Sequence, residues 1–433
     1  MAYWQQQLEC MEREELEQLQ SDRLLNVVRR MYENLPYYRE KMQAAGLRPE
    51  DIHGRQDLYK LPFTTKQDLN ANYPFGNFAV PMDRLVRIHA SSGTTGRQTV
   101  VAYTQKDINM WTDCMARALT AAGVVPGDRM HVAYGYGLFT GGMGFHYGGE
   151  AVGAAVIPVS GGNTRRQIQL LLDFKATVLC STPSYALYLA EEMERQGITK
   201  DDLHLRIGVF GAEPWSEQMR EQLNEQLGIQ SHDIYGLSEI MGPGVAVDCG
   251  CGAGLHIAED KFIVEVIDPE TEEVLPPGSQ GELVFTCLEK EALPLIRYRT
   301  HDLSALHLER CACGRTLARM EKVRGRSDDM LVIRGVNVFP TQIESVLLRF
   351  NEIMPHYMIY VDTKDLLDVM EIHVEMKQDL FTDEVKKIED LSSRLSQEIN
   401  SILGIKAKIK LVEPYSLERT SGKAKRVIDR RKT

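Results

Sequence analysis

A run of small and hydroxylated residues between positions 91 and 99, Ser-Ser-Gly-Thr-Thr-Gly-Arg-Gln-Thr, carries groups well suited to binding phosphate. Its glycines let the backbone curl toward a ligand, so that N–H groups converge into an anion-binding nest, and its hydroxyls add donors. The Gly-Lys-Ser/Thr ending of a Walker loop is absent, and Arg97 stands where a lysine would be expected. We therefore expect a polyphosphate site of another kind, with a flexible surface loop as the alternative.

Two further loops, Phe210–Trp215 and His232–Glu239, place glycine and acidic residues at the ends of expected strands. Glycines there would let a planar adenine lie between backbone segments, and Glu239 could ligate a Mg²⁺ ion carried by phosphates. Asp302 offers a carboxylate that could chelate the two hydroxyls of a ribose. An ordinary turn is the alternative in each case.

Four of the eight cysteines form two Cys-x-Cys pairs, one near residue 250 and one near residue 312. In a reducing compartment, clustered thiols in so long a chain favour metal binding over a disulfide scaffold. Cys249, His256, Cys311 and Cys313 would make a tetrahedral zinc site, and Cys251 could replace one ligand. The alternative is a set of reduced, buried thiols.

Alternating strand and helix patterns between residues 85 and 236 predict the scaffold that positions the loops. Strands rich in Val, Ile and Ala with helical crossovers favour a mainly parallel sheet covered on both faces, with ligands at the carboxyl ends of its strands. The expected strands are Leu85–Ala90, Met130–Tyr134, Ala155–Val159, Thr177–Cys180, Arg206–Phe210 and His232–Tyr235. The expected helices between them are Asp107–Ala122, Arg165–Phe174, Ser184–Arg195 and Ser216–Leu227.

The N-terminal arm has a different pattern, a helical stripe of apolar residues from Glu14 to Met42. Thr64 or Thr65 could cap a helix that follows this arm. Lys66 stands beside that cap, where it could reach a phosphate or remain a surface charge.

Beyond Gly254, strands follow one another without helices and predict a β-rich subdomain that includes Phe262–Ile267 and Glu282–Thr286. From residue 330 onward, mixed elements predict a small α+β domain. Its expected elements are Leu331–Ile333, Thr341–Phe350, His356–Val361, Glu371–Met376, Asp383–Leu403 and Lys408–Val412. The boundary is expected near Asp328, which gives an N-terminal domain of residues 1–327 and a C-terminal domain of residues 328–433.

The composition excludes several classes of protein. With 433 residues, of which 43% are apolar and 26% charged, the chain has ample material for globular cores. A net charge of −11 argues against a protein that coats nucleic acid. The N-terminus lacks the order of a secretion signal, and the apolar runs are too short to span a bilayer. We expect a soluble, cytoplasmic protein whose partners are neither nucleic acid nor membrane.

The combined motifs resemble the acyl- and aryl-CoA synthetases of the adenylate-forming superfamily. The phosphate loop, Tyr235–Glu239, Asp302, Gly325–Asp329 and Ser421–Lys423 occur in the order found there. The whole chain is similar to one branch, the phenylacetate–CoA ligases. The segments that resemble this branch are Leu61–Lys66, Gly135–Gly142, Gly211–Glu213, Gly254–Ile257, Cys313–Thr316 and Arg334–Pro340.

The resemblance implies an α/β enzyme. It would have a large N-terminal domain with mainly parallel sheets and a β-rich subdomain, and a small, mobile α+β C-terminal domain. The implied reaction joins a carboxylate and ATP into an acyl-adenylate with release of pyrophosphate, after which the thiol of coenzyme A displaces AMP. The rate enhancement would come from in-line placement of the carboxylate and from neutralisation of the charge that develops as pyrophosphate leaves. The implied cofactors are ATP, Mg²⁺ and coenzyme A, and the acid is phenylacetate or a related aryl-acetic acid.

The resemblance also assigns roles to single residues. Lys423 is expected to contact the carboxylate and the α-phosphate, Glu239 the Mg²⁺ ion, and Asp302 and Arg326 the ribose. Asp328 is the expected hinge about which the C-terminal domain rotates, withdrawing Lys423 and presenting Arg334 to the thiol tunnel. The other expected nucleotide contacts are Lys66, Ser91, Ser92, Gly93, Thr94, Thr95, Gly96, Gly211, Ala212, Glu213, Pro214, Asp233, Ile234, Tyr235, Gly236, Leu237 and Ser238. The expected ring pocket consists of Tyr134, Tyr136, Phe139, Ala212, Ile234 and Pro243, with core packing as the alternative.

Two other functions remain open from the sequence. One is an adenylating enzyme that passes its aryl acid to a separate carrier protein, and the other is a non-catalytic nucleotide-binding protein. The complete set of loops, together with Asp328 and Lys423, counts against the second. The sequence does not distinguish phenylacetate from a hydroxylated variant or indoleacetate, and it leaves a homodimer open.

Overall fold

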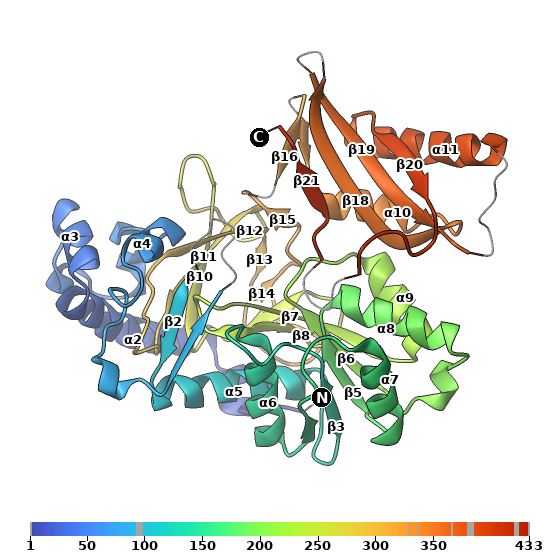
Figure 1. Cartoon of the computed structure of the whole chain (residues 1–433). Helices are drawn as coiled ribbons and strands as arrows, with labels where there is room; N and C mark the ends of the chain where they lie inside the picture. Colours follow the sequence, from blue (N-terminus) through green and yellow to red (C-terminus); the bar gives the residue numbers. More distant parts are fainter. Residues whose placement is uncertain are drawn as a thin grey trace.

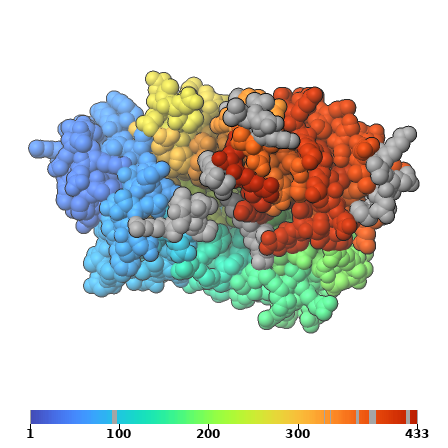
Figure 2. Space-filling model, turned by 45° about the horizontal axis from the view of Figure 1, so that its top comes forward, coloured from blue at the N-terminus to red at the C-terminus, as the bar shows by residue number. Residues whose placement is uncertain are grey.

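The computed structural model describes residues 2–91, 98–328, 330–334, 336–364, 367–378, 385–419 and 424–431. Elements before residue 328 form a large body, and those after residue 330 gather on one side of it (Figure 1). In the space-filling view, the orange and red C-terminal residues cover one side of the visible face, and red residues reach its middle (Figure 2). The mixed α/β architecture predicted from the sequence is confirmed.

A nine-stranded sheet runs through the large body in the order β13-β14-β9-β8-β7-β6-β5-β3-β4. The run from β7 to β4 is parallel, and the strands from β8 to β13 continue it in antiparallel fashion. The strands are β3 (Arg129–Val132), β4 (Ala155–Ile157), β5 (Val178–Ser181), β6 (Ile207–Gly211), β7 (Gln230–Leu237), β8 (Gly242–Asp248), β9 (Leu255–Ile257), β13 (Leu306–His307) and β14 (Arg319–Met320).

Helices cover both faces of the parallel part, as the alternation along β5 shows. Val178 and Cys180 pack in the hydrophobic cluster that contains α5 and α6, whereas Leu179 packs in the cluster that contains α7, α8 and α9. Successive side chains of a strand point to opposite faces, so an all-apolar strand must be covered twice. The helices are α5 (Gln105–Ala121), α6 (Gly141–Val152), α7 (Thr164–Asp173), α8 (Pro183–Arg195) and α9 (Glu217–Leu227).

The expectation that residues 85–90 belong to the parallel sheet was wrong. β1 (Arg87–Ala90) instead pairs in antiparallel fashion with β2 (Val100–Tyr103) in a separate two-stranded sheet. The element that follows β1 is therefore an antiparallel partner strand and not a crossover helix. Four residues of β2 carry too short a periodic signal to be distinguished from a loop.

A second sheet, β10-β11-β12-β15, is antiparallel and matches the predicted β-rich segment. The N-terminal helices pack on it, because α2 residues such as Val28 share a hydrophobic cluster with Ile263 and Ile296. Thr65 caps α4 by accepting a hydrogen bond from the Asp68 N–H at 3.3 Å. These elements are α1 (Gln6–Glu9), α2 (Arg13–Asn34), α3 (Pro36–Ala44), α4 (Lys66–Ala71), β10 (Phe262–Ile267), β11 (Gly281–Cys287), β12 (Tyr298–Ser304) and β15 (Gly325–Arg326).

The C-terminal elements build a four-stranded sheet in the order β20-β19-β18-β21 and a small β16-β17 hairpin. Leu391, Leu395, Ile399 and Leu403 recur every fourth residue along α11 and are buried, so one stripe of this helix packs on the sheet. These residues share a hydrophobic cluster made of C-terminal residues alone. The elements are β16 (Leu331–Ile333), β17 (Val336–Val338), α10 (Pro340–Leu347), β18 (Ile353–Lys364), β19 (Leu367–Met376), α11 (Val385–Leu403), β20 (Lys408–Val412) and β21 (Val427–Asp429).

Candidate active site

Two adjoining cavities lie at the carboxyl ends of β6 and β7, where a parallel sheet presents its loops. The narrow cavity has a volume of about 130 Å³ and the wide cavity about 280 Å³. The two adjoin because they share wall residues. These shared residues are Ala212, Ile234, Gly236, Leu237 and Arg326.

The backbone between β6 and the narrow cavity is unusually tight. A Cβ atom on Gly211 would lie 2.2 Å from the Ile234 carbonyl oxygen, so only glycine fits beside β7. Ala212 then adopts a left-handed conformation with φ of 71°, which is uncommon for a residue with a side chain. This turn carries the chain across the cavity wall at Ala212, Glu213 and Pro214.

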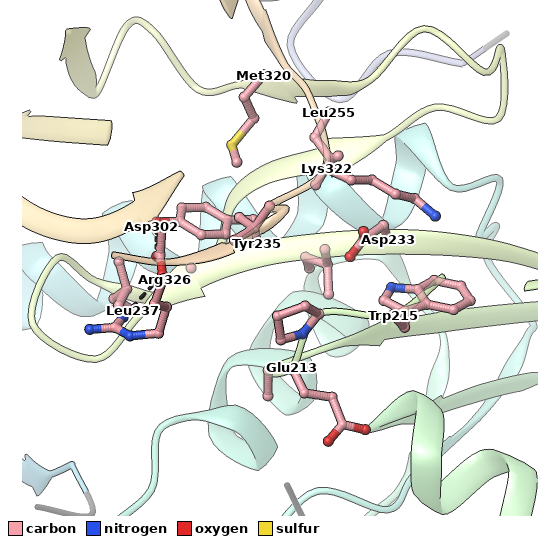
Figure 3. A pocket seen from close by; sticks show the side chains of 15 residues that line it. Glu213, Trp215, Asp233, Tyr235, Leu237, Leu255, Asp302, Met320, Lys322 and Arg326 are labelled. Carbon is pink, nitrogen blue, oxygen red and sulfur yellow. Dashed lines mark hydrogen bonds and ion pairs between the residues drawn. The ribbon is translucent and has the colours of Figure 1, made fainter. Parts of the chain in front are cut away.

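A hydrogen-bonded trio lies at one end of the narrow cavity (Figure 3). The Tyr235 hydroxyl donates to Asp302 Oδ2 at 2.7 Å, and Arg326 Nη1 donates to Asp302 Oδ1 at 3.0 Å. Arg326 also contacts Asp328 Oδ1 through its Nε at 2.8 Å, and this guanidinium lowers the pKa of Asp328 although burial opposes it. The trio thus fixes one carboxylate at the cavity wall and ties it to the expected hinge residue.

The other end of the narrow cavity contains Asp233, Lys322 and Trp215. Burial raises the pKa of Asp233 to about 6, even though Lys322 and Arg220 favour its charged form. Lys322 Nζ lies 4.6 Å from the centre of the Trp215 ring and pairs with Glu217. Met320, Lys322 and Val323 also line this cavity and were not predicted, because no motif marks them. Trp215 and Leu255 line it too, and they fall within the segments Phe210–Trp215 and Gly254–Ile257 that the sequence singles out.

The wide cavity has an aromatic wall. Tyr134 stacks on Phe145 with ring centres 4.9 Å apart, and its hydroxyl donates to the Ser181 carbonyl at 2.5 Å. Burial raises the pKa of Tyr134, so the hydroxyl stays protonated at neutral pH. The expected ring-pocket residues Tyr134, Phe139, Ala212, Ile234 and Pro243 all line the cavity.

Tyr136 is the exception among the expected ring-pocket residues. It does not line the wide cavity, and its hydroxyl lies 3.4 Å from His146 Nδ1. Both tyrosines follow β3, which ends at Val132, and the Tyr136 ring packs on His146 of α6 with ring centres 5.8 Å apart.

The polar side of the wide cavity contains Lys66, Ser91, Ser238 and Glu239. Glu239 is 6% exposed, and the Ser91 hydroxyl donates to its Oε1 at 3.4 Å. Lys290 is fully buried behind this carboxylate, and its Nζ donates to the Glu239 carbonyl at 2.9 Å. Burial lowers the pKa of Lys290, because the charged ammonium group is removed from water.

Several expected site residues lie outside the described part of the chain. They are Ser92, Gly93, Thr94, Thr95, Gly96 and Lys423. Arg334 is described, but it lines neither cavity. Its Nε donates to the Asp368 carbonyl at 2.7 Å within the C-terminal elements, and its φ is 51°.

The C-terminal elements contact the large body close to the narrow cavity. Ala424 N donates to Glu213 Oε2 at 2.8 Å, and Ser216 N donates to Glu344 Oε1 at 3.2 Å. Farther along, His356 Nε2 lies 2.7 Å from Glu191 on α8. The C-terminal elements are therefore anchored to the loop that follows β6.

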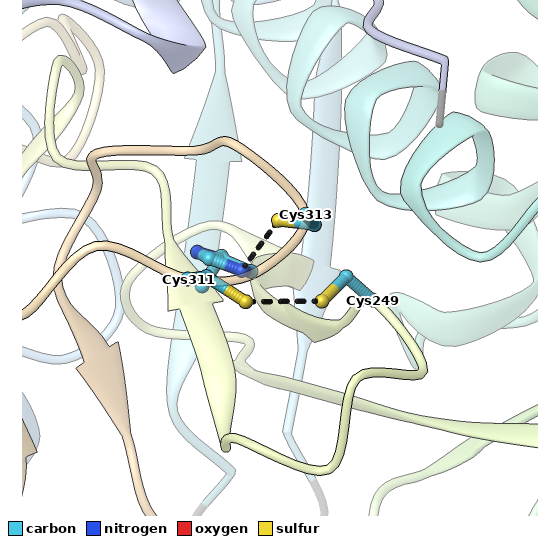
Figure 4. A group of neighbouring side chains, drawn as sticks. Cys249, Cys311 and Cys313 are labelled. Carbon is cyan, nitrogen blue, oxygen red and sulfur yellow. Dashed lines mark hydrogen bonds between the residues drawn. The ribbon is translucent and has the colours of Figure 1, made fainter.

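A cluster of thiols and one imidazole lies away from both cavities (Figure 4). The ligand atoms of Cys249, His256, Cys311 and Cys313 all lie within 4.8 Å of one another, and all four residues are buried. The Cys249 and Cys311 sulfurs are 3.8 Å apart, which is too far for a disulfide. This sulfur–sulfur distance equals the ligand–ligand distance of about 3.8 Å in a tetrahedral site whose zinc–sulfur bonds are about 2.3 Å long. Cys251 packs beside this group without belonging to it.

The N-terminus encloses this cluster. The Tyr3 hydroxyl donates to the Cys313 carbonyl at 2.8 Å, and Arg315 Nη1 lies 3.6 Å from the Cys313 sulfur. Arg315 Nε in turn donates to Glu9 Oε2 at 2.7 Å, and both side chains are at most 1% exposed. Residues of the N-terminal segment therefore lie directly against the thiol cluster.

Comparison with protein families gives two matches along the chain. The AMP-binding enzyme model matches residues 20–286, and the model of the AMP-binding enzyme C-terminal domain matches residues 335–431. The chain belongs to the AMP-binding enzyme family.

Individual relatives narrow this assignment. The chain is 50% identical over 427 residues to a phenylacetate-coenzyme A ligase of Aromatoleum evansii, covering 98% of this chain and 96% of that one. It is 48% identical to a phenylacetate-coenzyme A ligase of Thermus thermophilus, covering 99% and 100%. Within the family it therefore falls among the phenylacetate–coenzyme A ligases, which are acid–thiol ligases.

A solved relative indicates the arrangement of the two parts. The chain matches 2-hydroxyisobutyryl-CoA ligase in the postadenylation state with a TM-score of 0.93 at 28% identity, covering 99% of this chain and 93% of that one. Against the same ligase in the thioesterification state, the TM-score is 0.73 at 29% identity, with coverages of 98% and 92%. The C-terminal elements thus lie as in the postadenylation state.

Among the described residues, no helix is both long enough and apolar enough to cross a membrane.

Proposed function

We propose that the protein ligates phenylacetate, or a closely related aryl-acetic acid, to coenzyme A through an acyl-adenylate, releasing AMP and pyrophosphate. One observation carries this proposal: the aromatic wide cavity opens beside the narrow cavity with its fixed Asp302 carboxylate, in a chain about half identical to phenylacetate–coenzyme A ligases. A cavity for a ring next to one for a nucleoside suits an aryl-adenylate.

The nucleoside occupies the narrow cavity in this proposal. Adenine lies against Ala212–Pro214 and Tyr235, and the ribose hydroxyls donate to Asp302 beside Arg326. Tyr235 and Arg326 both donate to Asp302 and so hold its carboxylate at the cavity wall, where it can accept hydrogen bonds from hydroxyls. The phosphates extend into the wide cavity toward the hydroxylated loop that begins at Ser91.

The acid occupies the apolar part of the wide cavity. Its ring lies among Tyr134, Phe139 and Pro243, and its carboxylate points toward the α-phosphate. The carboxylate is already ionised at neutral pH, so no general base is needed, and the protein contributes placement and charge. Lys423 supplies the positive charge. Glu239 would hold the Mg²⁺ ion of ATP, which neutralises phosphate charge when bound.

The C-terminal part acts as a lid of residues 328–433 that alternates between two placements. Asp328, paired with Arg326, is the proposed hinge. In the placement described here, the lid segment after Lys423 lies at the loop that follows β6. Rotation would withdraw Lys423 and bring Arg334 toward coenzyme A for thioester formation.

A structural zinc ion at Cys249, His256, Cys311 and Cys313 is the further part of the proposal. Four buried ligand atoms within 4.8 Å, and a sulfur separation of 3.8 Å, fit a tetrahedral site. Such an ion would join the β8–β9 connection to the loop before β14. It lies outside both cavities and supplies no step of the reaction.

Release of pyrophosphate on mixing phenylacetate, ATP and Mg²⁺ tests the first half-reaction. A panel of phenylacetate, hydroxyphenylacetate, indoleacetate and a fatty acid, read out as the coenzyme A thioester, then identifies the acid. Pyrophosphate release without consumption of coenzyme A would favour a carrier protein as the acceptor. Equal rates with the fatty acid would contradict the aromatic pocket, and no release with any acid would contradict the proposed function.

A further inference from the structure

Glu213 bridges the large body and the lid through its two carboxylate oxygens. Oε1 accepts a hydrogen bond from Ser184 N at 2.9 Å, at the start of α8. Oε2 accepts one from Ala424 N at 2.8 Å, in the lid. Ala424 directly follows Lys423 in the chain. One side chain thus connects the rigid sheet region to the backbone beside the expected catalytic lysine.

The backbone before Glu213 determines where this carboxylate points. The left-handed Ala212 turns the chain, and residues 212–214 line the narrow cavity. The Glu213 side chain extends away from Tyr235 and Asp302, toward the end of a helix (Figure 3). The carboxylate is therefore directed away from the nucleoside cavity.

One backbone N–H group at the start of α8 is available to donate to Glu213. Pro183 has no N–H, and Thr182 accepts from Tyr185 N through its side chain at 3.4 Å. Ser184 N is the donor between them, and Glu213 accepts from it. The positive end of this 13-residue helix also favours a negative group.

The lid side carries complementary charge. Although burial opposes its ionisation, Tyr357, Glu344 and Glu213 raise the pKa of Arg426. Arg426 lies two residues after Ala424 and 3.8 Å from Glu344. Both hydrogen bonds to Glu213 come from N–H donors, so a carboxylate, which only accepts, suits the position better than an amide.

We propose that Glu213 is a positioning residue that holds the lid segment after Lys423 against α8, and so sets the lysine for adenylate formation. The inference rests on the proposed function and assigns no contact between the Glu213 carboxylate and substrate. The bond to Ala424 must break when the lid rotates, whereas the bond to Ser184 stays within the large body. We call the two hydrogen bonds of Glu213, to Ser184 and to Ala424, the clamp. Loss of the clamp therefore affects adenylate formation and not thioester formation.

Glu213→Gln tests the clamp, because the amide keeps the shape but offers only one accepting oxygen. Hydrogen–deuterium exchange should be measured in peptides that span residue 424, in the full-length protein with and without ATP and phenylacetate. The amide of Ala424 should exchange roughly five- to tenfold faster in the variant, as expected for one lost hydrogen bond. Unchanged exchange at this amide would overturn the proposal.

The two half-reactions give a second readout. In Glu213→Gln, kcat for pyrophosphate release should fall roughly five- to tenfold while the KM for ATP stays within about twofold, and thioester formation from supplied acyl-adenylate should persist. A raised KM with unchanged kcat would mean a nucleotide contact and overturn the proposal. An equal loss of both half-reactions would overturn it as well.

Glu221→Gln is the matched control, because Glu221 is an exposed glutamate on the neighbouring α9. It should leave exchange and both rates unchanged. If the wild-type protein releases no pyrophosphate with any acid, the proposed function fails, and the exchange at Ala424 still decides whether the clamp exists.

Discussion

The Tyr235 hydroxyl donates a 2.7 Å hydrogen bond to Asp302 Oδ2, which joins the end of β7 to β12 across 67 residues of sequence. Arg326 holds the other oxygen at 3.0 Å. The carboxylate is thereby oriented before any ligand binds. Preorganisation of this kind reduces the ordering that a ribose would otherwise require on binding.

Tyr235→Phe should weaken ATP binding roughly five- to tenfold, because one donor to the partly buried carboxylate is lost while the aromatic ring remains stacked on Phe285. The KM for ATP in the pyrophosphate assay measures this effect. Tyr185→Phe, in the hydrophobic cluster of α7–α9, is the control and should leave the KM unchanged. An unaltered KM in Tyr235→Phe would contradict the role given to Asp302.

Lys423→Ala should lower the rate of adenylate formation by a factor on the order of 10² to 10³, because a charge aimed at the reacting oxygens is lost. Thioester formation from supplied acyl-adenylate and coenzyme A should be largely retained, since the lysine is withdrawn for that step. Single-turnover measurements of each half-reaction check the difference. A parallel loss of both steps would contradict the rotating lid.

The purified protein should contain one zinc ion per chain, measured by elemental analysis. Cys313→Ser should lose the ion and unfold at lower temperature, because a structural zinc site contributes folding energy directly. Cys251→Ser should retain the ion, since Cys251 is not among the four clustered ligands. Zinc well below stoichiometry in a stably folded protein would contradict the site.

Asp233→Asn should stabilise the folded protein at neutral pH. The folded-state pKa of about 6 lies above the unfolded value of 3.8, so the folded state binds more protons between these values and wild-type stability falls as pH rises. The gain from Asn should grow from nearly zero at pH 4 to roughly 1–3 kcal/mol above pH 6. Urea unfolding of both proteins from pH 4 to 8 measures it. A gain independent of pH would show that Asp233 is not destabilised by burial.

The strands and helices with long periodic signals could be predicted from sequence. Lys408–Val412 was expected and observed with the same bounds, and Ser184–Arg195 differs by one residue from α8. Helix α6 was missed because five glycines in twelve residues mask its pattern. The structure explains one of them, since a Cβ on Gly148 would lie 2.5 Å from Met115 Cβ, where α6 crosses α5.

The residues of the candidate site also divide into those that the sequence predicts and those that it does not. Residues within local motifs, such as Tyr235 and Asp302, could be predicted because their types suit nucleotide chemistry and their order resembles a known family. Lys322 could not, because its proximity to Asp233 arises only when distant segments meet. Glu213 and Ala424 are 211 residues apart, and the donor in their hydrogen bond is a backbone N–H. Because a backbone donor does not depend on the residue type, the sequence does not indicate this contact.

The buried ion pair between Glu9 and Arg315 can form only after residue 315 has been synthesised. The two residues are 306 positions apart, so at 5–20 residues per second Glu9 emerges from the ribosome roughly 15–60 s before its partner. Until then the Glu9 carboxylate has no guanidinium to offset its burial, and the bond from Arg315 to the Ala2 carbonyl is missing as well. The packing around Glu9 is therefore completed only after residue 315 has been synthesised.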